Sequence, residues 1–173
     1  MIRAKLLFTK ICLAAFSISG AAQDGALDPT FNVGDAGFSR GDGTGGVNVV
    51  VPLSDGKVLI GGSGTFYNGE PFGRIGRVNV DGLLDAGFIT GTGADNIIRT
   101  MALRPDGKIL IAGDFTSYNG VARNRIARLN ADGSLDLAFN PGSGADAPIL
   151  KLVLQPDGGV VIAGEFTNFN ATP

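Results

Sequence analysis

The residues from position 47 onward repeat with a period of 51 positions, and this register constrains the fold more than any other feature. Three Asp-Gly pairs occur at this spacing, and so do an isoleucine and a threonine in each copy: Asp55-Gly56, Asp106-Gly107 and Asp157-Gly158; Ile60, Ile111 and Ile162; Thr65, Thr116 and Thr167. An ungapped alignment of 55–88 on 106–139 gives 19 identities in 34 positions. A period near this length predicts a solenoid, a propeller or an array whose units bury their faces against their neighbours.

The content of one unit predicts β-structure throughout. Two apolar runs, 97–103 and 108–112, flank a turn at Arg104–Gly107, in which Pro105 presets φ and the glycine permits a positive φ. The same register predicts antiparallel hairpins of 47–53 with 57–62, 97–103 with 108–113 and 149–154 with 160–164, joined by structural turns at Asp55, Gly56, Asp106, Gly107, Asp157 and Gly158.

The sequence of one unit contains segments for four strands. After the hairpin, a turn at 118–120 precedes a strand at 125–130, and a turn at 131–133 precedes a short strand at 135–139. The run Lys108–Gly113 is apolar without alternation, which indicates a strand covered on both faces. Neighbouring blades provide both covers in a β-propeller, whereas a β-solenoid usually has shorter coils. The predicted fold class is therefore all-β, with propeller blades of four antiparallel strands in an incomplete ring.

The units Pro105–Gly120 and Arg123–Asp136 resemble bacterial delta-60 repeats, and the resemblance extends over about residues 24 to 170. Kelch and WD-type repeats fit less well because they depend on tryptophan, which this chain lacks. The resemblance implies an exported repeat scaffold that builds β-propellers, often within large surface proteins. It implies no catalytic residue.

The first 23 residues have the order of a secretory signal peptide. A basic start is followed by the apolar stretch 11–18 and by small residues at 20–22; the basic residues are Arg3, Lys5 and Lys10. A buried N-terminal strand or helix is the alternative. Cleavage would remove the single cysteine, Cys12, and change the net charge from −2 to −5. We therefore expect a protein secreted to the exterior or the surface of a bacterial cell, without membrane insertion after cleavage and without a nucleic-acid partner.

The expected organisation after the signal peptide 1–23 is a partial β-propeller over 24–173. It comprises a repeat-end strand (24–46), two repeats (47–96 and 97–148) and a truncated repeat (149–173). Propellers need about four to eight blades, so the register predicts a fragment of a longer chain with further repeats. Completion of the ring by oligomers is the alternative, and an isolated array should expose one apolar blade surface.

The composition excludes several classes of catalyst. A chain without histidine has no imidazole base, no Ser-His pair and no imidazole metal ligand. We expect no catalytic residue, no metal and no cofactor, and a non-catalytic scaffold for protein or glycan interaction or adhesion. The alternative is a carbohydrate-active hydrolase or lyase that uses Asp and Tyr in a propeller funnel.

The predicted binding residues lie in the repeated turn that follows the second strand of each unit. An aromatic ring and an asparagine recur there: Tyr67, Asn68, Tyr118, Asn119, Phe169 and Asn170. Exposed rings would stack on sugars or anchor a partner. In the alternative, which the residues favour, each ring packs beneath its own loop.

Other polar patterns favour structural roles. The segments 79–85 and 130–136 carry Asp residues as calcium loops do, but Arg77 and Arg128 occupy an earlier ligand position, so Asx turns are preferred over calcium. Asp114 and Glu165 share one repeat position and predict ion pairs with the repeated arginines in preference to a glycosidase carboxylate pair. The glycine-rich segments 91–95 and 142–146 precede strands and contain no Gly-Lys-Ser/Thr, so they are interpreted as loops.

Overall fold

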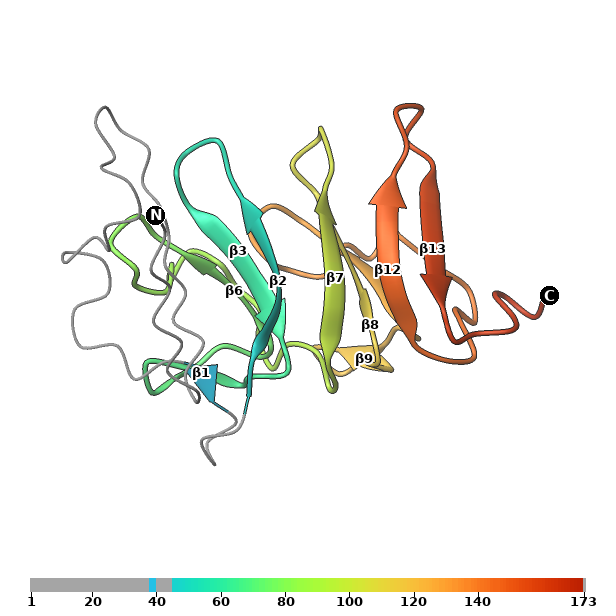
Figure 1. Ribbon diagram of the computed structural model, residues 1–173, viewed down its shortest axis with the longest axis horizontal. Coiled ribbons are helices and arrows are strands. Elements are labelled where there is room, and N and C mark those ends of the chain that lie inside the picture. Colours follow the sequence, from blue (N-terminus) through green and yellow to red (C-terminus); the bar gives the residue numbers. More distant parts are fainter. Residues whose placement is uncertain (1–37, 40–44, 173) are drawn as a thin grey trace, which may run out of the picture.

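The computed structural model describes residues 38–39 and 45–172, and strands and turns make up all of this part of the chain. The strands stand in consecutive antiparallel blades that lie side by side, with the C-terminus at one end of the row (Figure 1). Their bounds are β1 (Phe38–Ser39), β2 (Val47–Pro52), β3 (Val58–Gly62), β4 (Phe66–Tyr67), β5 (Glu70–Pro71), β6 (Ile75–Val78), β7 (Ile98–Leu103), β8 (Ile109–Gly113), β9 (Ser117–Tyr118), β10 (Val121–Ala122), β11 (Ile126–Leu129), β12 (Ile149–Leu154) and β13 (Val160–Gly164).

Each blade is built around one hairpin, as the register predicts. The first blade has the strand order β2-β3-β6, the second β11-β8-β7, and the third contains β12-β13. In the hairpins, Val50 pairs with Ile60, Met101 with Ile111, and Leu152 with Ile162. The predicted hairpins are therefore confirmed, and each first strand carries a register shift near its start.

The fourth strand of each blade is shorter than the prediction of 135–139. It consists of a single bridge, Val78 to Leu84 in the first blade and Leu129 to Leu135 in the second. The chain turns directly afterwards because the Asp136 carboxylate accepts the amide of Ala138 at 3.0 Å and its carbonyl accepts that of Phe139 at 3.2 Å. The aromatic ring then lies under Arg128, 4.9 Å from the guanidinium carbon, instead of continuing the sheet.

The hydrophobic core lies between the blades. Every residue of β8 is buried, which confirms that this strand is covered on both faces. One apolar cluster joins the first and second blades and includes Leu59, Met101 and Ile111, whereas another joins the second and third and includes Leu110 and Leu152. The strands β2, β7 and β12 mediate most of the packing between neighbouring blades.

The predicted Asp-Gly turns are present in all three hairpins. The Asp side chain accepts the amide two residues on, at 3.1 Å for Asp55, 3.1 Å for Asp106 and 2.9 Å for Asp157. The following glycines, Gly56, Gly107 and Gly158, have φ between 79° and 86°. This is the left-handed region, in which a side chain is unfavourable, so the sequence pattern has a direct backbone reason.

Over the described residues the blades form an open array and close no ring. The predicted signal peptide 1–23 and most of the predicted repeat-end strand 24–46 lie outside the described residues. Within the described part of the chain, no helix has the length and hydrophobicity to cross a membrane.

Candidate functional site

The tyrosines of the repeated turn lie in the core. Tyr67 is 2% exposed and Tyr118 is 0% exposed. Their hydroxyls donate to the carbonyls of Gly82 and Gly133, at 2.6 and 2.9 Å, in the third turn of the same blade. Phe169 is half-buried against the cluster between the second and third blades. The two tyrosine rings therefore present no stacking face, and the structure has the alternative arrangement in which rings pack beneath the loops.

The asparagines of the same turn shape the backbone and contact the neighbouring loop. Asn68, Asn119 and Asn170 have φ between 48° and 53°, and in the first two copies a positive-φ glycine follows, which makes the tight Asn-Gly turn of a β-hairpin. Asn119 accepts the Thr92 amide at 3.2 Å, and Asn170 accepts the Gly144 amide at 3.0 Å. Any ligand of these turns would meet asparagine side chains and backbone.

The glycine-rich segments are the loops that join one blade to the next. Each ends on an aspartate that caps the following blade: Asp95 accepts the amides of Thr116 and Ser117 at 2.8 and 3.0 Å. In the next copy Asp146 accepts the amide of Thr167 at 2.9 Å and the amide and side chain of Asn168 at 3.2 and 2.9 Å. The asparagine and threonine side chains hold the pKa of Asp146 well below its ordinary value, so this carboxylate is ionised at neutral pH.

Glycine is required where these loops approach the preceding blade. At Gly144, where φ is 70°, a Cβ would collide with the carbonyl oxygen of Asn124; at Gly93, where φ is 69°, it would collide with that of Gly73. The Ser-Gly-Ala-Asp and Thr-Gly-Ala-Asp segments are therefore loops for close backbone contact, in agreement with the interpretation from sequence.

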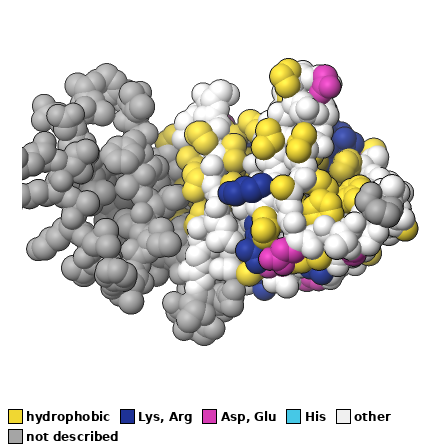
Figure 2. All heavy atoms as spheres, turned by 45° about the vertical axis from the view of Figure 1, so that its right-hand side comes forward, with side chains coloured by type: hydrophobic (Ala, Val, Ile, Leu, Met, Phe, Trp, Pro, Cys, Tyr) yellow, Lys and Arg dark blue, Asp and Glu magenta, His cyan; other side chains and the backbone are white. Residues whose placement is uncertain are grey.

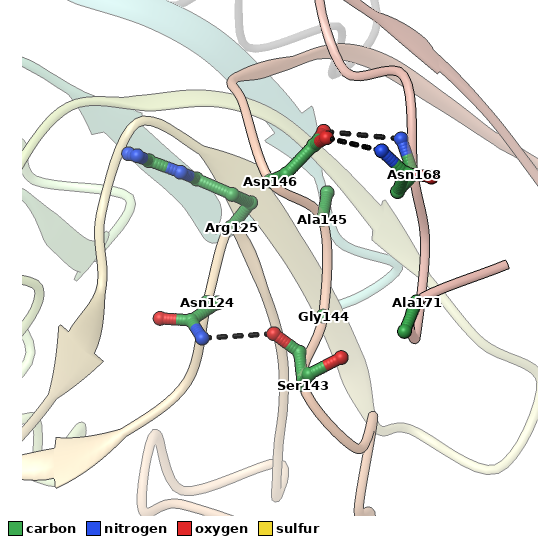
Figure 3. A pocket seen from close by; sticks show the side chains of 8 residues that line it. All are labelled: Asn124, Arg125, Ser143, Gly144, Ala145, Asp146, Asn168 and Ala171. Atoms are coloured by element: carbon green, nitrogen blue, oxygen red, sulfur yellow. Dashed lines mark hydrogen bonds between the residues drawn. The ribbon is translucent and has the colours of Figure 1, made fainter. Parts of the chain in front are cut away.

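The two blade junctions differ in the arginine that begins the third strand of the blade. Arg74 and Arg125 occupy the same repeat position and share a φ of 67°, which is unusual for a side chain of this size. Arg74 donates to the carbonyl of Ala94 across the first junction at 2.6 Å. Arg125 instead donates to the carbonyl of Asp114 in its own blade, and its guanidinium extends away from Ala145 (Figure 3).

A hollow of about 530 Å³ lies at the second junction, where Arg125 has turned away. Asn124 stands in place of Gly73 and donates to the carbonyl of Ser143 at 2.8 Å, while Asp146 and Asn168 form the opposite wall (Figure 3). Its lining residues are Asn124, Arg125, Ser143, Gly144, Ala145, Asp146, Asn168 and Ala171. This groove offers amides, a hydroxyl, a carboxylate and backbone groups, and its apolar lining is confined to small alanines.

In the segments considered as calcium loops, 79–85 and 130–136, the last aspartate forms ion pairs with basic side chains. Asp85 lies 2.7 Å from both Lys57 Nζ and Arg77 Nε, and Asp136 lies at the same distances from Lys108 and Arg128. The Lys108 ammonium, with Arg128 and the Ala138 amide, lowers the pKa of Asp136 to about 2 against the effect of burial. Within the described residues, no cluster of three or more Asp, Glu, His or Cys side chains has the arrangement of a metal site.

Asp114 forms an ion pair, as the sequence predicts, but its partner is an arginine that sequence reasoning missed. Within the second blade, the Arg99 guanidinium donates two hydrogen bonds to the Asp114 carboxylate, at 2.5 and 2.7 Å. Glu165 occupies the same repeat position in the third blade, and its negative charge contributes to raising the pKa of Arg99. Arg99 has no charged counterpart in the other copies, where Asn48 and Leu150 stand, and this asymmetry was the available signal.

The groove residues Asn124, Ser143 and Asn168 were also missed by sequence reasoning, although the glycine-rich loop and the turn beside them were recognised. Their signal was again a difference between copies, since Gly73, Thr92 and Ser117 occupy the same positions in the preceding unit.

A family model described as "Domain of unknown function (DUF5122) beta-propeller" matches three segments of the chain, residues 53–88, 104–139 and 155–173. These segments cover more than half of the sequence. Each begins at the residue after the first strand of a hairpin and contains the second strand, β3, β8 or β13. No curated protein and no solved structure matches the chain.

Proposed function

Because the chain belongs to the DUF5122 beta-propeller family, we propose that it is a non-catalytic propeller scaffold whose groove between the second and third blades binds a polar ligand, a carbohydrate in particular. The observation that carries this proposal is the 530 Å³ hollow at the one described junction where the repeated arginine does not reach across to the next loop. The resemblance of the units to bacterial delta-60 repeats supports display of this scaffold outside the cell.

The lining favours a carbohydrate because hydroxyl-rich ligands need both donors and acceptors at close spacing. Asn124, Ser143 and Asn168 provide amide and hydroxyl groups. Asp146 contributes negative potential while its oxygens accept from the 167–168 turn. A neutral, hydroxylated ligand meets the polar groups of this groove without burying an unpaired charge.

A non-catalytic role is supported by the state of the carboxylates. Asp85, Asp136 and Asp114 pair with basic side chains, and Asp146 is held ionised by hydrogen bonds. A general acid in glycoside cleavage must keep its proton near neutral pH, which requires a raised pKa. The depressed pKa of Asp146 is opposite to that requirement.

The experiment compares glycan binding by the wild type, Ser143→Trp and Thr92→Trp on an array of defined oligosaccharides, followed by titration of each hit. Tryptophan at the exposed Ser143 fills the groove, and we expect at least about a tenfold loss of affinity, which corresponds to about 1.4 kcal/mol. Thr92 is the same position of the loop at the first junction, so Thr92→Trp is the matched control and should leave affinity unchanged.

Equal binding by the wild type and Ser143→Trp, or the absence of any carbohydrate ligand, contradicts the proposal. Cleavage of a bound oligosaccharide, seen as new reducing ends in the same samples, would favour the carbohydrate-active enzyme instead.

A further inference from the structure

The two junctions inside the row of blades can be compared position by position, since each is enclosed by two described blades. At the C-terminal end of the row, by contrast, hydrophobic side chains of the third blade lie on the surface (Figure 2). The residue before the repeated arginine is Gly73 at the first junction and Asn124 at the second. Gly73 has a φ of 59°, whereas the φ of Asn124 is not positive. One repeat position therefore has two backbone conformations in the same chain.

With glycine at this position, backbone groups close the junction. The Ala94 amide donates to the carbonyl of Gly73 at 3.1 Å, and Arg74 donates to the carbonyl of Ala94 at 2.6 Å. An added Cβ at Gly73 would lie 2.9 Å from the Cα of Gly93. Packed carbon atoms lie about 3.5 to 4.0 Å apart, so the closed arrangement has no room for a side chain at this position.

With asparagine at this position, a side chain makes the contact across the junction. Asn124 Nδ2 donates to the carbonyl of Ser143 at 2.8 Å (Figure 3). Between these described residues, the Ala145 amide makes no hydrogen bond to the Asn124 carbonyl, although its counterpart at the first junction does. Arg125 donates to the carbonyl of Asp114 in its own blade. The hollow of about 530 Å³ lies where the closing contacts are missing.

The choice of acceptor by the arginine does not explain the difference between the junctions. Arg125 uses a backbone carbonyl, that of Asp114, and Ser63 has the same group at the same repeat position. Arg74 nevertheless reaches across the first junction. The next blade likewise offers Arg125 the carbonyl of Ala145, from which it turns away (Figure 3). Both acceptors exist in both copies, and the difference closest to the arginine in sequence is the residue before it.

We propose that Asn124 is the positioning residue of the groove, and that its repeat position decides whether a junction is closed or carries a binding site. The inference rests on the proposed function for the class of ligand. Glycine permits the positive φ and the close backbone contact of the closed junction. A side chain at this position collides with the next loop in that arrangement, so the arginine turns away and the groove remains. The first junction is then a second site that a single substitution opens.

Amide hydrogen exchange of the full chain, followed by NMR, measures the state of each junction without a ligand. Gly73→Asn should raise the exchange rate of the Ala94 amide by about tenfold or more, because the side chain breaks the hydrogen bond to residue 73. Asn124→Gly should lower the exchange rate of the Ala145 amide by about the same factor, because the junction closes. Glycine adopts either backbone conformation, so the second variant tests the inference even if the first is poorly folded.

Each of these variants has a matched control. Gly69 also has a positive φ, of 82°, but an added Cβ there meets no atom within 4 Å. Gly69→Asn therefore makes the same substitution without the steric conflict, and it should leave exchange of the Ala94 amide unchanged. Asn124→Ala keeps a Cβ at the position and removes only the amide, so the Ala145 amide should exchange at the wild-type rate.

Binding to the array of defined oligosaccharides connects the state of the junctions to the proposed function. Asn124→Gly should weaken binding by at least about tenfold, because the groove closes. Gly73→Asn should add a second binding site per chain, measured by isothermal titration with the oligosaccharides that bind the wild type. In the Gly73→Asn chain, Thr92→Trp should remove this second site, although the same substitution has no effect while the first junction is closed.

The outcomes separate this inference from the proposed function. Unchanged exchange in both Gly73→Asn and Asn124→Gly would overturn the role of the repeat position, and so would closure of the second junction by Asn124→Ala. Carbohydrate binding that Asn124→Gly leaves intact would contradict the role of Asn124 alone. The expected changes in exchange without carbohydrate binding by the wild type would support that role and contradict the proposed function alone.

Discussion

Tyr67 and Tyr118 each connect two turns of their own blade. In each case the ring is buried and its hydroxyl donates one hydrogen bond. Each ring begins in the Tyr-Asn-Gly turn, and its hydroxyl ends on a glycine carbonyl of the Asp-Gly turn fifteen residues later. Burial raises the pKa of the Tyr118 hydroxyl, so it stays protonated and remains a donor throughout the ordinary pH range. The residue thus acts in the core of a blade.

Truncation of Tyr118 should separate the hydrogen bond from the packing of the ring. We expect Tyr118→Phe to lower the free energy of unfolding by about 1 kcal/mol because the Gly133 carbonyl loses its donor. Tyr118→Ala should lower it by about 3 kcal/mol or more because the buried ring is lost. Urea denaturation followed by circular dichroism measures both. A cost below 1 kcal/mol for Tyr118→Ala would show that the ring contributes no packing.

Asp136 should make the stability of the protein dependent on acidity. Its pKa falls from 3.8 to about 2 in the folded state, so its contribution is complete above about pH 4 and is lost as the pH falls toward 2. Asp136→Asn should lower stability at pH 7, by about 1 to 3 kcal/mol, because the buried Asp136 loses its charged hydrogen bonds to Lys108 and Arg128. The variant should also show a shallower decline between pH 4 and 2.

The control for this measurement is Asp157→Asn, which removes one carboxylate from an exposed turn while its side-chain oxygen can still accept the Gly159 amide. It should follow the wild-type curve. Parallel acid-unfolding curves for the wild type and Asp136→Asn would contradict the assignment.

At the scale of the strands, the Asp-Gly turns determine where each hairpin reverses. The 104–107 turn closes with Arg104 donating to the carbonyl of Lys108 at 2.8 Å and Gly107 donating to that of Arg104 at 3.0 Å. The backbone at Gly107 has a φ of 79°, and the closest atom to an added Cβ would be Ala131 Cβ at 3.8 Å. The site has room for a methyl group, and its conformation alone opposes one.

Gly107→Ala should therefore cost about 1 kcal/mol of stability through backbone strain without a steric clash. Gly46→Ala is a matched control because an added Cβ there also has open space, with no positive φ. Gly46→Ala should be neutral or slightly stabilising. Thermal melts of both variants provide the comparison, and equal melting temperatures would refute a conformational role for Gly107.

At the scale of the whole molecule, the third blade should be less stable than the second. The second blade is covered by a neighbour on both faces, and the third on one face. Phe115 and Phe166 occupy the same repeat position, but Phe115 is 0% exposed and Phe166 is half-buried. Phe115→Ala should cost about 3 to 5 kcal/mol of the free energy of unfolding, and Phe166→Ala distinctly less, in urea denaturation of the two variants. Equal costs would show that the third blade is as well covered as the second.

The outline of the candidate site was predictable only where the copies agree. The loop character of 91–95 and 142–146 and the turn at 118–120 follow from glycine and asparagine at positions that require positive φ. The groove depends on a difference between copies, Asn124 for Gly73, together with the direction in which Arg125 turns. The rotamer of a long side chain depends on which acceptors the packed blades bring within hydrogen-bond distance. The sequence around the arginine does not specify these acceptors.

The sequence by itself determined the all-β fold, the 51-residue register, the hairpins β2-β3, β7-β8 and β12-β13 and the turns between them. The turns and strands depend on interactions within a few residues, such as the positive φ of a glycine or the pattern of apolar residues along a strand. Only the tertiary structure decided that the tyrosine rings lie inside the blades, that the fourth strand shrinks to a single bridge, and that Val50 and Val161 remain exposed when their counterparts are buried. Identical repeat positions differ in burial because burial depends on the neighbouring blade, which the residues of one repeat do not specify.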